Sequence, residues 1–240
     1  MSPRGHVVWR GASPYDGGPI VAVVTMHSTN RKTGDMPQLW ILREDAPPMD
    51  ALRAGTDASV CGDCPLRGDG TGTGRACYVT LWQGPRSVWD AMRRGAYPDA
   101  TPEHVGTLLA GRMVRLGAYG DPAMLPIAVV RALIAHADGW TGYTHQWRRV
   151  SREWSGLLMA SADGVAARRE ARQAGWRSFV VLPQGAPMPD RTVACMATRE
   201  RNPRQCVTCG ACAGTRQGAT PTAVDIAIHA HGAGAGYVTA

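Results

Sequence analysis

Seven cysteines in two groups carry the clearest chemistry of the sequence. The first group is Cys61, Cys64 and Cys77, and the second group is Cys195, Cys206, Cys209 and Cys212. Close neighbours in each group are separated by two residues, a spacing that lets one tight turn direct two thiolates at the same metal. An odd number of cysteines in a chain that we expect in a reducing compartment argues against disulfides. We therefore expect all seven cysteines to be metal ligands.

The two groups favour different metal centres. The first has three thiolates, and no histidine lies between residues 61 and 77 to complete a zinc tetrahedron. Three thiolates suit a [4Fe–4S] cluster whose remaining iron is open to a substrate or cosubstrate. In the second group, Cys-x2-Cys-x2-Cys is the core of a ferredoxin-type ligand run, with Cys195 placed to be the fourth ligand. Four thiolates also suit a structural zinc ion, and Cys195 alone could be a small buried side chain, so zinc stays an alternative at this site.

Polar residues that directly follow apolar runs are the other candidates. Gly120 and Asp121 follow one such run, and Thr144 and His145 follow another. Functional groups in α/β folds gather at the carboxyl ends of parallel strands. We expect Asp121 and His145 to be catalytic groups, with Gly120, Asp121 and Thr144 beside a cofactor. The alternatives are a helix cap for Asp121 and a structural role for His145.

The elements that must position these residues are apolar runs separated by helical patterns. Buried strands are expected at residues 19–25, 113–119, 140–144, 156–161, 179–182, 192–195 and 225–228, and helices at 125–137 and 165–174. Continuous apolar strands that alternate with helices predict a parallel sheet. We expect one α/β domain over residues 1–240, a partial or closed (β/α) barrel, with an open doubly wound sheet as the alternative. Two cysteine-bearing loops, 54–77 and 195–222, would leave the same face of a barrel, so the two centres should lie on one side of the molecule.

Composition adds a weak indication about partners. The formal net charge is +7, and Lys32 is the only lysine. Such a charge fits a nucleic acid or nucleotide partner, but arginine usage in a GC-rich genome explains it equally well. No run of 18 apolar residues is present, so no membrane span is expected, and we place the chain in the cytoplasm. The pattern carries no signal for an oligomeric state.

The order of these motifs resembles a set of uncharacterised bacteriophage proteins. The shared features, across roughly residues 20–150, are the Ser28–Gly34 segment after the early strand, the Cys61–Pro65 loop, Cys77-Tyr78, Gly120-Asp121 and Tyr143-Thr144. Those proteins in turn resemble radical S-adenosylmethionine (SAM) enzymes. If the chain is phage-encoded, its place is the host cytoplasm.

The resemblance to radical SAM enzymes implies a fold and a set of roles. It implies a partial (β/α) barrel and a three-cysteine [4Fe–4S] site after the first strand. It places Gly120-Asp121-Pro122 where the superfamily contacts the SAM amino group, and makes the second cysteine group an auxiliary cluster site. The chain departs from the usual Cys-x3-Cys-x2-Cys spacing, and Asp121 stands where Glu is usual. The alternative hypothesis is a non-catalytic zinc- or cluster-stabilised protein that binds nucleic acid or a host factor.

Overall fold

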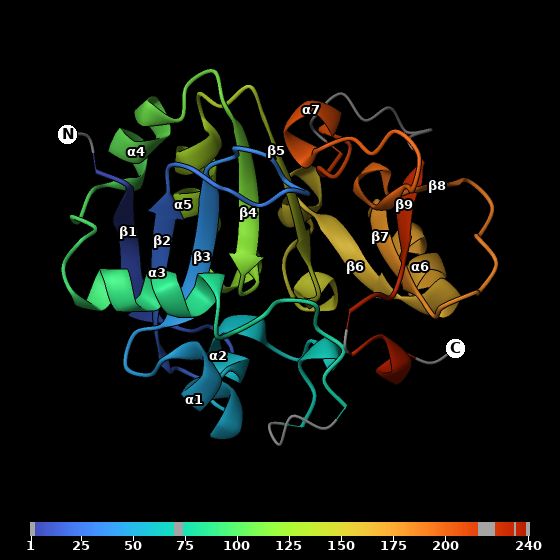
Figure 1. Cartoon of the computed structure of the whole chain (residues 1–240), viewed down its shortest axis with the longest axis horizontal. Helices are drawn as coiled ribbons and strands as arrows, with labels where there is room; N and C mark the ends of the chain where they lie inside the picture. Colours follow the sequence, from blue (N-terminus) through green and yellow to red (C-terminus); the bar gives the residue numbers. More distant parts are fainter. Residues whose placement is uncertain (1–2, 70–73, 216–223, 233, 239–240) are drawn as a thin grey trace.

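The fold is an α/β domain built on one mixed sheet of nine strands. The computed structural model describes residues 3–69, 74–215, 224–232 and 234–238, so parts of both cysteine-bearing loops lie outside the described residues. The strands are β1 (Gly5–Ala12), β2 (Pro19–Thr25), β3 (Gln38–Arg43), β4 (Met113–Tyr119), β5 (Gly139–Thr144), β6 (Met159–Asp163), β7 (Ser178–Leu182), β8 (Thr192–Ala194) and β9 (Asp225–His229). Their order in the sheet is β1-β2-β3-β4-β5-β6-β7-β9-β8 (Figure 1). The pairs β1–β2 and β2–β3 are antiparallel, and all the others are parallel.

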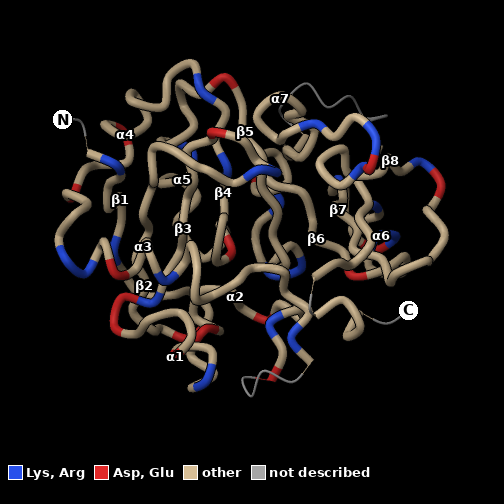
Figure 2. The backbone as a smooth tube through the Cα atoms, viewed as in Figure 1, with Lys and Arg blue, Asp and Glu red and all other residues tan. Residues whose placement is uncertain are grey.

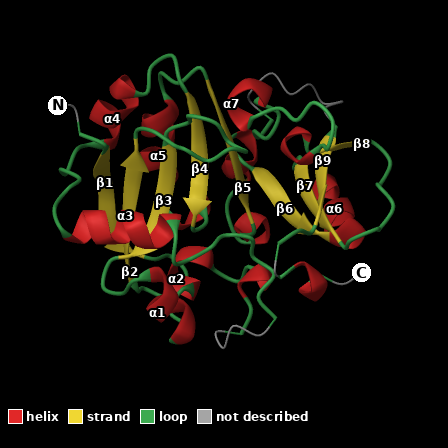
Figure 3. Cartoon of the chain, in the orientation of Figure 1, coloured by secondary structure: helices red, strands yellow, loops and turns green. Residues whose placement is uncertain are grey.

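Helices cover both faces of the sheet (Figure 3). The α-helices are α1 (Pro48–Arg53), α2 (Ala58–Cys61), α3 (Gly84–Arg93), α4 (Pro102–Leu108), α5 (Ile127–Ile134), α6 (Gly164–Gln173) and α7 (Cys206–Cys209). Short 3₁₀ turns join them, among them η1 (Pro65–Arg67) and η2 (Pro122–Met124). In Figure 1, α3 lies in front of β1–β3 and α5 lies behind them. No helix in the described ranges is long and apolar enough to cross a membrane.

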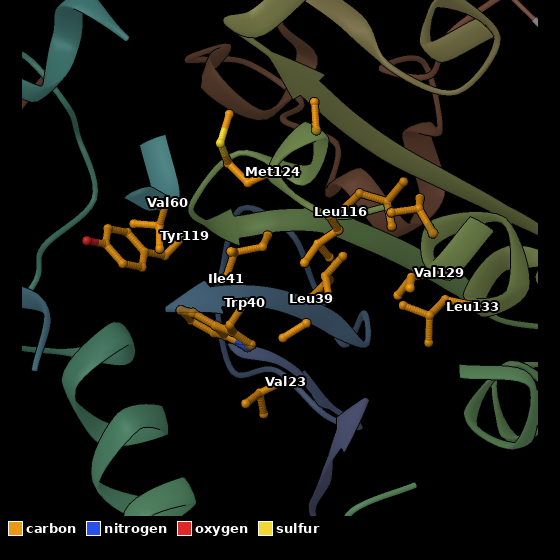
Figure 4. Packing of buried hydrophobic residues seen from close by; sticks show 14 of the residues in the cluster. Val23, Leu39, Trp40, Ile41, Val60, Leu116, Tyr119, Met124, Val129 and Leu133 are labelled. Atoms are coloured by element: carbon orange, nitrogen blue, oxygen red, sulfur yellow. The ribbon is translucent and has the colours of Figure 1, made fainter. Parts of the chain in front are cut away.

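Side chains along the central strands alternate between a closed core and an open face. Leu116 of β4 packs with Leu39 of β3 and with Leu133 of α5 in the main hydrophobic core (Figure 4). Successive side chains of a strand point to opposite faces of the sheet. Arg115 therefore points away from Leu116 and this core, toward the cavity that thiols of both cysteine groups line. The face that carries Leu116 and Leu133 is filled, and part of the opposite face is left for a site.

An ionic contact fixes the last strands to their helix. The Asp225 carboxylate of β9 is fully buried and accepts hydrogen bonds from Arg168 and Arg172 of α6 at 2.8 and 2.9 Å. It also accepts the backbone N–H of Ser178, at the start of β7. One carboxylate thus ties two strands and a helix together where the second cysteine group packs.

Comparison with the expected elements gives one agreement and two corrections. The seven expected strands and both expected helices are present within a few residues of their predicted bounds. Strands β1 and β3 were not expected, and they add the antiparallel edge of the sheet. Among the described residues no ladder joins β1 to β8, so a closed barrel is wrong and the sheet has two free edges.

A cavity between two cysteine groups

One cavity of about 400 Å³ lies on the open face of the sheet, and thiols of both groups line it. Strands β3, β4, β5, β6, β7 and β9 each contribute a wall residue, namely Trp40, Arg115, Tyr143, Ser161, Val181 and Ile228. Its volume is that of a typical small-molecule site.

The first cysteine group is formed by a turn between α2 and η1. Cys61 ends α2, Gly62 takes a positive φ of 60°, and Cys64 precedes the proline that opens η1. A Cβ on Gly62 would collide with the Gln146 side chain, whose amide donates to the Cys61 carbonyl at 3.2 Å. This packing ties the turn to the end of β5.

Cys77 returns to the same place from the other end of its loop. Its N–H donates to the Leu66 carbonyl at 2.8 Å, and the Arg75 guanidinium donates to the carbonyls of Cys77 and Val79. Burial raises the pKa of the Cys61 and Cys77 thiols, and the neighbouring thiols raise that of Cys61 further. These thiols are therefore neutral at pH 7 unless a metal binds and displaces their protons.

The second group surrounds a small pocket of about 30 Å³ that Cys195, Cys206, Cys209 and Cys212 all line. Backbone hydrogen bonds hold its loop in place, since the Cys206 N–H donates to the Lys32 carbonyl at 3.0 Å and the Cys212 carbonyl accepts from Gly142 at 2.8 Å. The structure therefore brings together the four cysteines that the sequence analysis had grouped.

A buried arginine shapes the electrostatics of this second group. Burial raises the pKa of the Cys206 thiol and raises that of Cys212 to about 12, and Arg115 opposes both shifts. Thiolates here would be stabilised by Arg115. Sequence reasoning missed this residue because an arginine inside an apolar strand carries no motif.

The arrangement of thiols can be compared with what metals require. All seven cysteines are free thiols. Among the described residues, no group of three or more Cys, His, Asp or Glu side chains is close enough to hold a single ion. A cubane cluster holds its thiolates farther apart than one ion does, because sulfide and iron fill the space between them. The three thiols of the first group, on the wall of the larger cavity, are the type of donor that an iron–sulfur cluster requires. The pocket of the second group is narrower and has room for only one or two water-sized atoms.

The two groups lie toward opposite ends of β4, so the two loops do not meet at one end of the strands as expected, although Cys195 and Cys206 line the same cavity as the first group. The Val60 carbonyl beside Cys61 accepts from the N–H of Asp121, just past the carboxyl end of β4. Gly210, between the last two cysteines, approaches Met113 at the start of the same strand. Figure 1 shows α2 below and α7 above the sheet.

Asp121 lines the cavity, but its carboxylate is occupied by the chain itself. It accepts hydrogen bonds from the Ala123 N–H at 2.9 Å, the Thr144 hydroxyl at 3.0 Å and the His145 N–H at 2.8 Å. Burial raises its pKa, and these donors counteract the shift. It also caps η2 from a buried position, so the alternative of a cap role is right. Thr144 lies behind this carboxylate and does not line the cavity.

Gly120 is placed at the cavity for a steric reason. It has a positive φ of 77°, and a Cβ there would lie 2.5 Å from the Ile41 carbonyl oxygen. Only glycine allows the end of β4 to approach β3 this closely. Asp121 takes its position from this contact.

His145 stands between the first cysteine group and an acidic residue. Its Nε2 lies 3.5 Å from Asp163 Oδ2 and has no hydrogen-bond partner among the described residues. Burial opposes the charged imidazolium, but Cys64 and Asp163 outweigh it and raise the pKa of His145 well above its usual value. A charged His145 imidazolium at this position can donate a hydrogen bond to the Cys64 thiolate.

Comparison of the chain with family models, with curated proteins and with solved structures finds no match.

Proposed function

We propose that this chain is an iron–sulfur enzyme of the radical SAM-like kind, with a [4Fe–4S] cluster held by Cys61, Cys64 and Cys77. The observation that carries the proposal is the meeting of these three thiols on the wall of one cavity, at the carboxyl end of β4. Their number leaves one iron free for a ligand. Cluster thiolates are also favoured by the neighbouring His145.

The order of the elements supports this proposal better than the sequence pattern alone did. Strand β3, which the pattern missed, is the first of the parallel series β3-β4-β5-β6-β7. The first cysteine loop follows β3, with Cys61 18 residues after Arg43, and Gly120-Asp121-Pro122 ends the next strand. This is the order that the resemblance implies for a cluster loop and a SAM-contacting segment in a partial (β/α) barrel.

Roles for the surrounding residues follow from their contacts. When bound, the cluster would supply an electron and an open iron to chelate SAM. Asp121 orients the end of β5 and the N–H of His145, which makes it a positioning residue. His145 directs its ring toward Cys64 and stabilises negative charge on that sulfur.

At the second group we propose a structural metal site. Its ligands would be Cys195, Cys206, Cys209 and Cys212, which line one pocket of about 30 Å³, and the metal is either a zinc ion or an auxiliary cluster. Binding would draw these thiols closer together than they lie in this structure. A chain that held zinc there and no iron elsewhere would instead fit the non-catalytic alternative.

Anaerobic purification followed by iron, sulfide and zinc analysis tests this function. We expect brown protein with iron and acid-labile sulfide in equal amounts, and calorimetric binding of SAM only after reconstitution. The His145→Ala variant should keep its iron but bleach faster in air, whereas His136→Ala, on an exposed residue, should behave as the wild type. Colourless protein with zinc alone would refute the cluster. Iron–sulfide protein that gives no heat with SAM would remove SAM from the function.

A further inference from the structure

Arg115 is a buried cation without a carboxylate partner. Its side chain lines the cavity, yet only 5% of the residue is exposed. No acidic side chain in the described ranges forms an ion pair with it. Its recorded contacts are the Tyr78 hydroxyl, which accepts a hydrogen bond at 3.3 Å, and the Tyr143 ring, 4.4 Å from the guanidinium carbon. A buried charge is costly unless it is paired, and a small anion in the cavity would supply the negative charge that the two tyrosines lack.

The mouth of the cavity beside Arg115 is also cationic. The Lys32 ammonium lies 2.8 Å from His231 Nε2, and the His231 ring stacks on Tyr78 at 6.1 Å between centroids. These residues come from three distant segments, and all of them line the cavity. Tyr78 connects the exposed mouth of the cavity to buried Arg115, because the residue is 58% exposed while its hydroxyl accepts a hydrogen bond from Arg115.

Acidic residues of the cavity lie at its other end. The only carboxylates among its described lining residues are Asp57 and Asp121. Asp57 pairs with Arg67, and Asp121 accepts three hydrogen bonds from the chain. The two carboxylates of the cavity are therefore both occupied by the chain itself, and neither pairs with Arg115.

We propose that the cavity binds a small organic anion whose phosphate or carboxylate group pairs with Arg115, while its apolar part extends toward the first cysteine group. The planar guanidinium fits either group in a two-pronged contact. Phe179, stacked on Tyr143 with 4.2 Å between ring centroids, adds a flat apolar wall. This deepens the proposed function by naming a substrate class for the same cavity.

Geometry separates this subsite from the first metal centre. Arg115 lies four residues before Tyr119 on β4, at the end of the cavity where it opposes the pKa shift of Cys206. A ligand of the open iron and an anion on Arg115 would thus occupy different ends of the cavity. The cavity volume of about 400 Å³ suits a small molecule better than a nucleic acid. Figure 2 shows Lys and Arg spread over the molecule instead of gathered in one stripe.

Calorimetry on the purified protein, without added iron or SAM, tests the subsite with adenosine monophosphate, uncharged adenosine and benzoate. We expect an anion to bind and adenosine to bind about tenfold more weakly or not at all. Arg115→Met should weaken anion binding by about tenfold or more, Arg115→Lys by less, and Arg94→Met, on an exposed arginine, should match the wild type. Preference for the monophosphate or for benzoate distinguishes a phosphate from a carboxylate.

Three results would overturn the proposal. In the first, the wild-type protein binds neither anion. In the second, Arg115→Met binds the anion as tightly as the wild type does. In the third, Arg115→Met loses the metal of the second group but keeps its anion affinity. The last result would make Arg115 a counter-ion for thiolates. If Arg115→Met does not fold, Lys32→Met at the exposed mouth of the cavity replaces it as the test. Anion affinity and salt dependence equal to those of the wild type would then reject the subsite. Because no iron is required, failure of the cluster proposal leaves this test intact.

Discussion

Asp121 joins the ends of two neighbouring strands through one buried carboxylate, and this contact sets the position of His145. Asn at this position keeps one acceptor oxygen but replaces the other with an NH₂ group, which cannot accept from Thr144 or from the His145 N–H. We expect Asp121→Asn to lower the free energy of unfolding by about 1–3 kcal/mol, because two buried donors lose their acceptor.

Urea unfolding measures this loss, and Asp138→Asn, on an exposed carboxylate, is the matched control. SAM affinity of the reconstituted protein separates positioning from direct contact. A variant of wild-type stability with abolished SAM binding would mean that Asp121 touches the ligand, contrary to its contacts in this structure.

Single residues also show where sequence reasoning stopped. The cysteines were recognisable because ligand spacing is local, and the structure brings each group to one pocket. Arg115 was not recognisable, because its importance comes from what surrounds it. Asp121 was recognised at its strand end, but two of its hydrogen-bond partners, Thr144 and His145, lie more than 20 residues away and have no local signature.

At the scale of elements, His6 makes the first strand sensitive to acid. It is buried in β1, its ring lies 6.4 Å from that of His104 in α4, and its Nδ1 has no partner among the described residues. Burial lowers its pKa, and His104 lowers it further. As pH falls below the unfolded value of about 6.5, the unfolded chain takes up a proton that the folded chain resists. Stability should therefore fall with pH until the folded pKa is passed.

Chemical unfolding at pH 7.5 and at pH 5 compares the wild type with His6→Phe, which removes the titrating group and keeps a ring. We expect the variant to lose less stability across this interval. An equal loss in both proteins would show that other groups, such as the remaining histidines, cause the acid sensitivity.

The ionic contact between α6 and the last strands gives a second prediction at this scale. Asp225→Asn would leave Arg168 and Arg172 without their shared carboxylate, so we expect a loss of about 3 kcal/mol of stability. Thermal unfolding followed by circular dichroism measures it. Glu170→Gln, in an exposed pair with Arg148, should change stability little. Equal effects of the two changes would mean that burial adds nothing to the Asp225 contact.

The parallel strands were predictable, and the edge of the sheet was not. Residues 20–24 of β2 form a continuous apolar run with no exposed surface, which is typical of a strand buried on both faces. In β1 an irregularity between Val7 and Trp9 breaks the two-residue period. The apolar run of β3, Leu39–Leu42, is too short for its period to separate strand from helix. Because β3 was not expected, the sequence pattern also did not show that the cysteine loop follows the first parallel strand and that the Gly120-Asp121 segment follows the next one.

At the scale of the whole molecule, the chain places two cysteine groups at opposite ends of one strand. The expectation of a common side failed because the loop after β8 runs back across the amino ends of the strands. Backbone hydrogen bonds from Cys206 and Val207 to the carbonyls of Lys32 and Thr33 hold it there. Backbone contacts of this kind do not depend on side-chain type, so no pattern in the sequence announces them.

Because the two groups lie on different loops, each should bind its metal independently of the other. Metal binding contributes directly to the folding of small ligand loops, so the loss of one thiolate should affect its own loop and spare the other. The two groups are therefore each other's controls.

Metal analysis of anaerobically reconstituted Cys64→Ala and Cys209→Ala proteins, beside the wild type, tests the central claim most directly. We predict that Cys64→Ala loses iron and sulfide but keeps the metal of the second group, and that Cys209→Ala keeps its iron and sulfide and loses that second metal. If either single change removes all metal, or if neither removes any, the assignment of the seven cysteines to two separate centres is wrong.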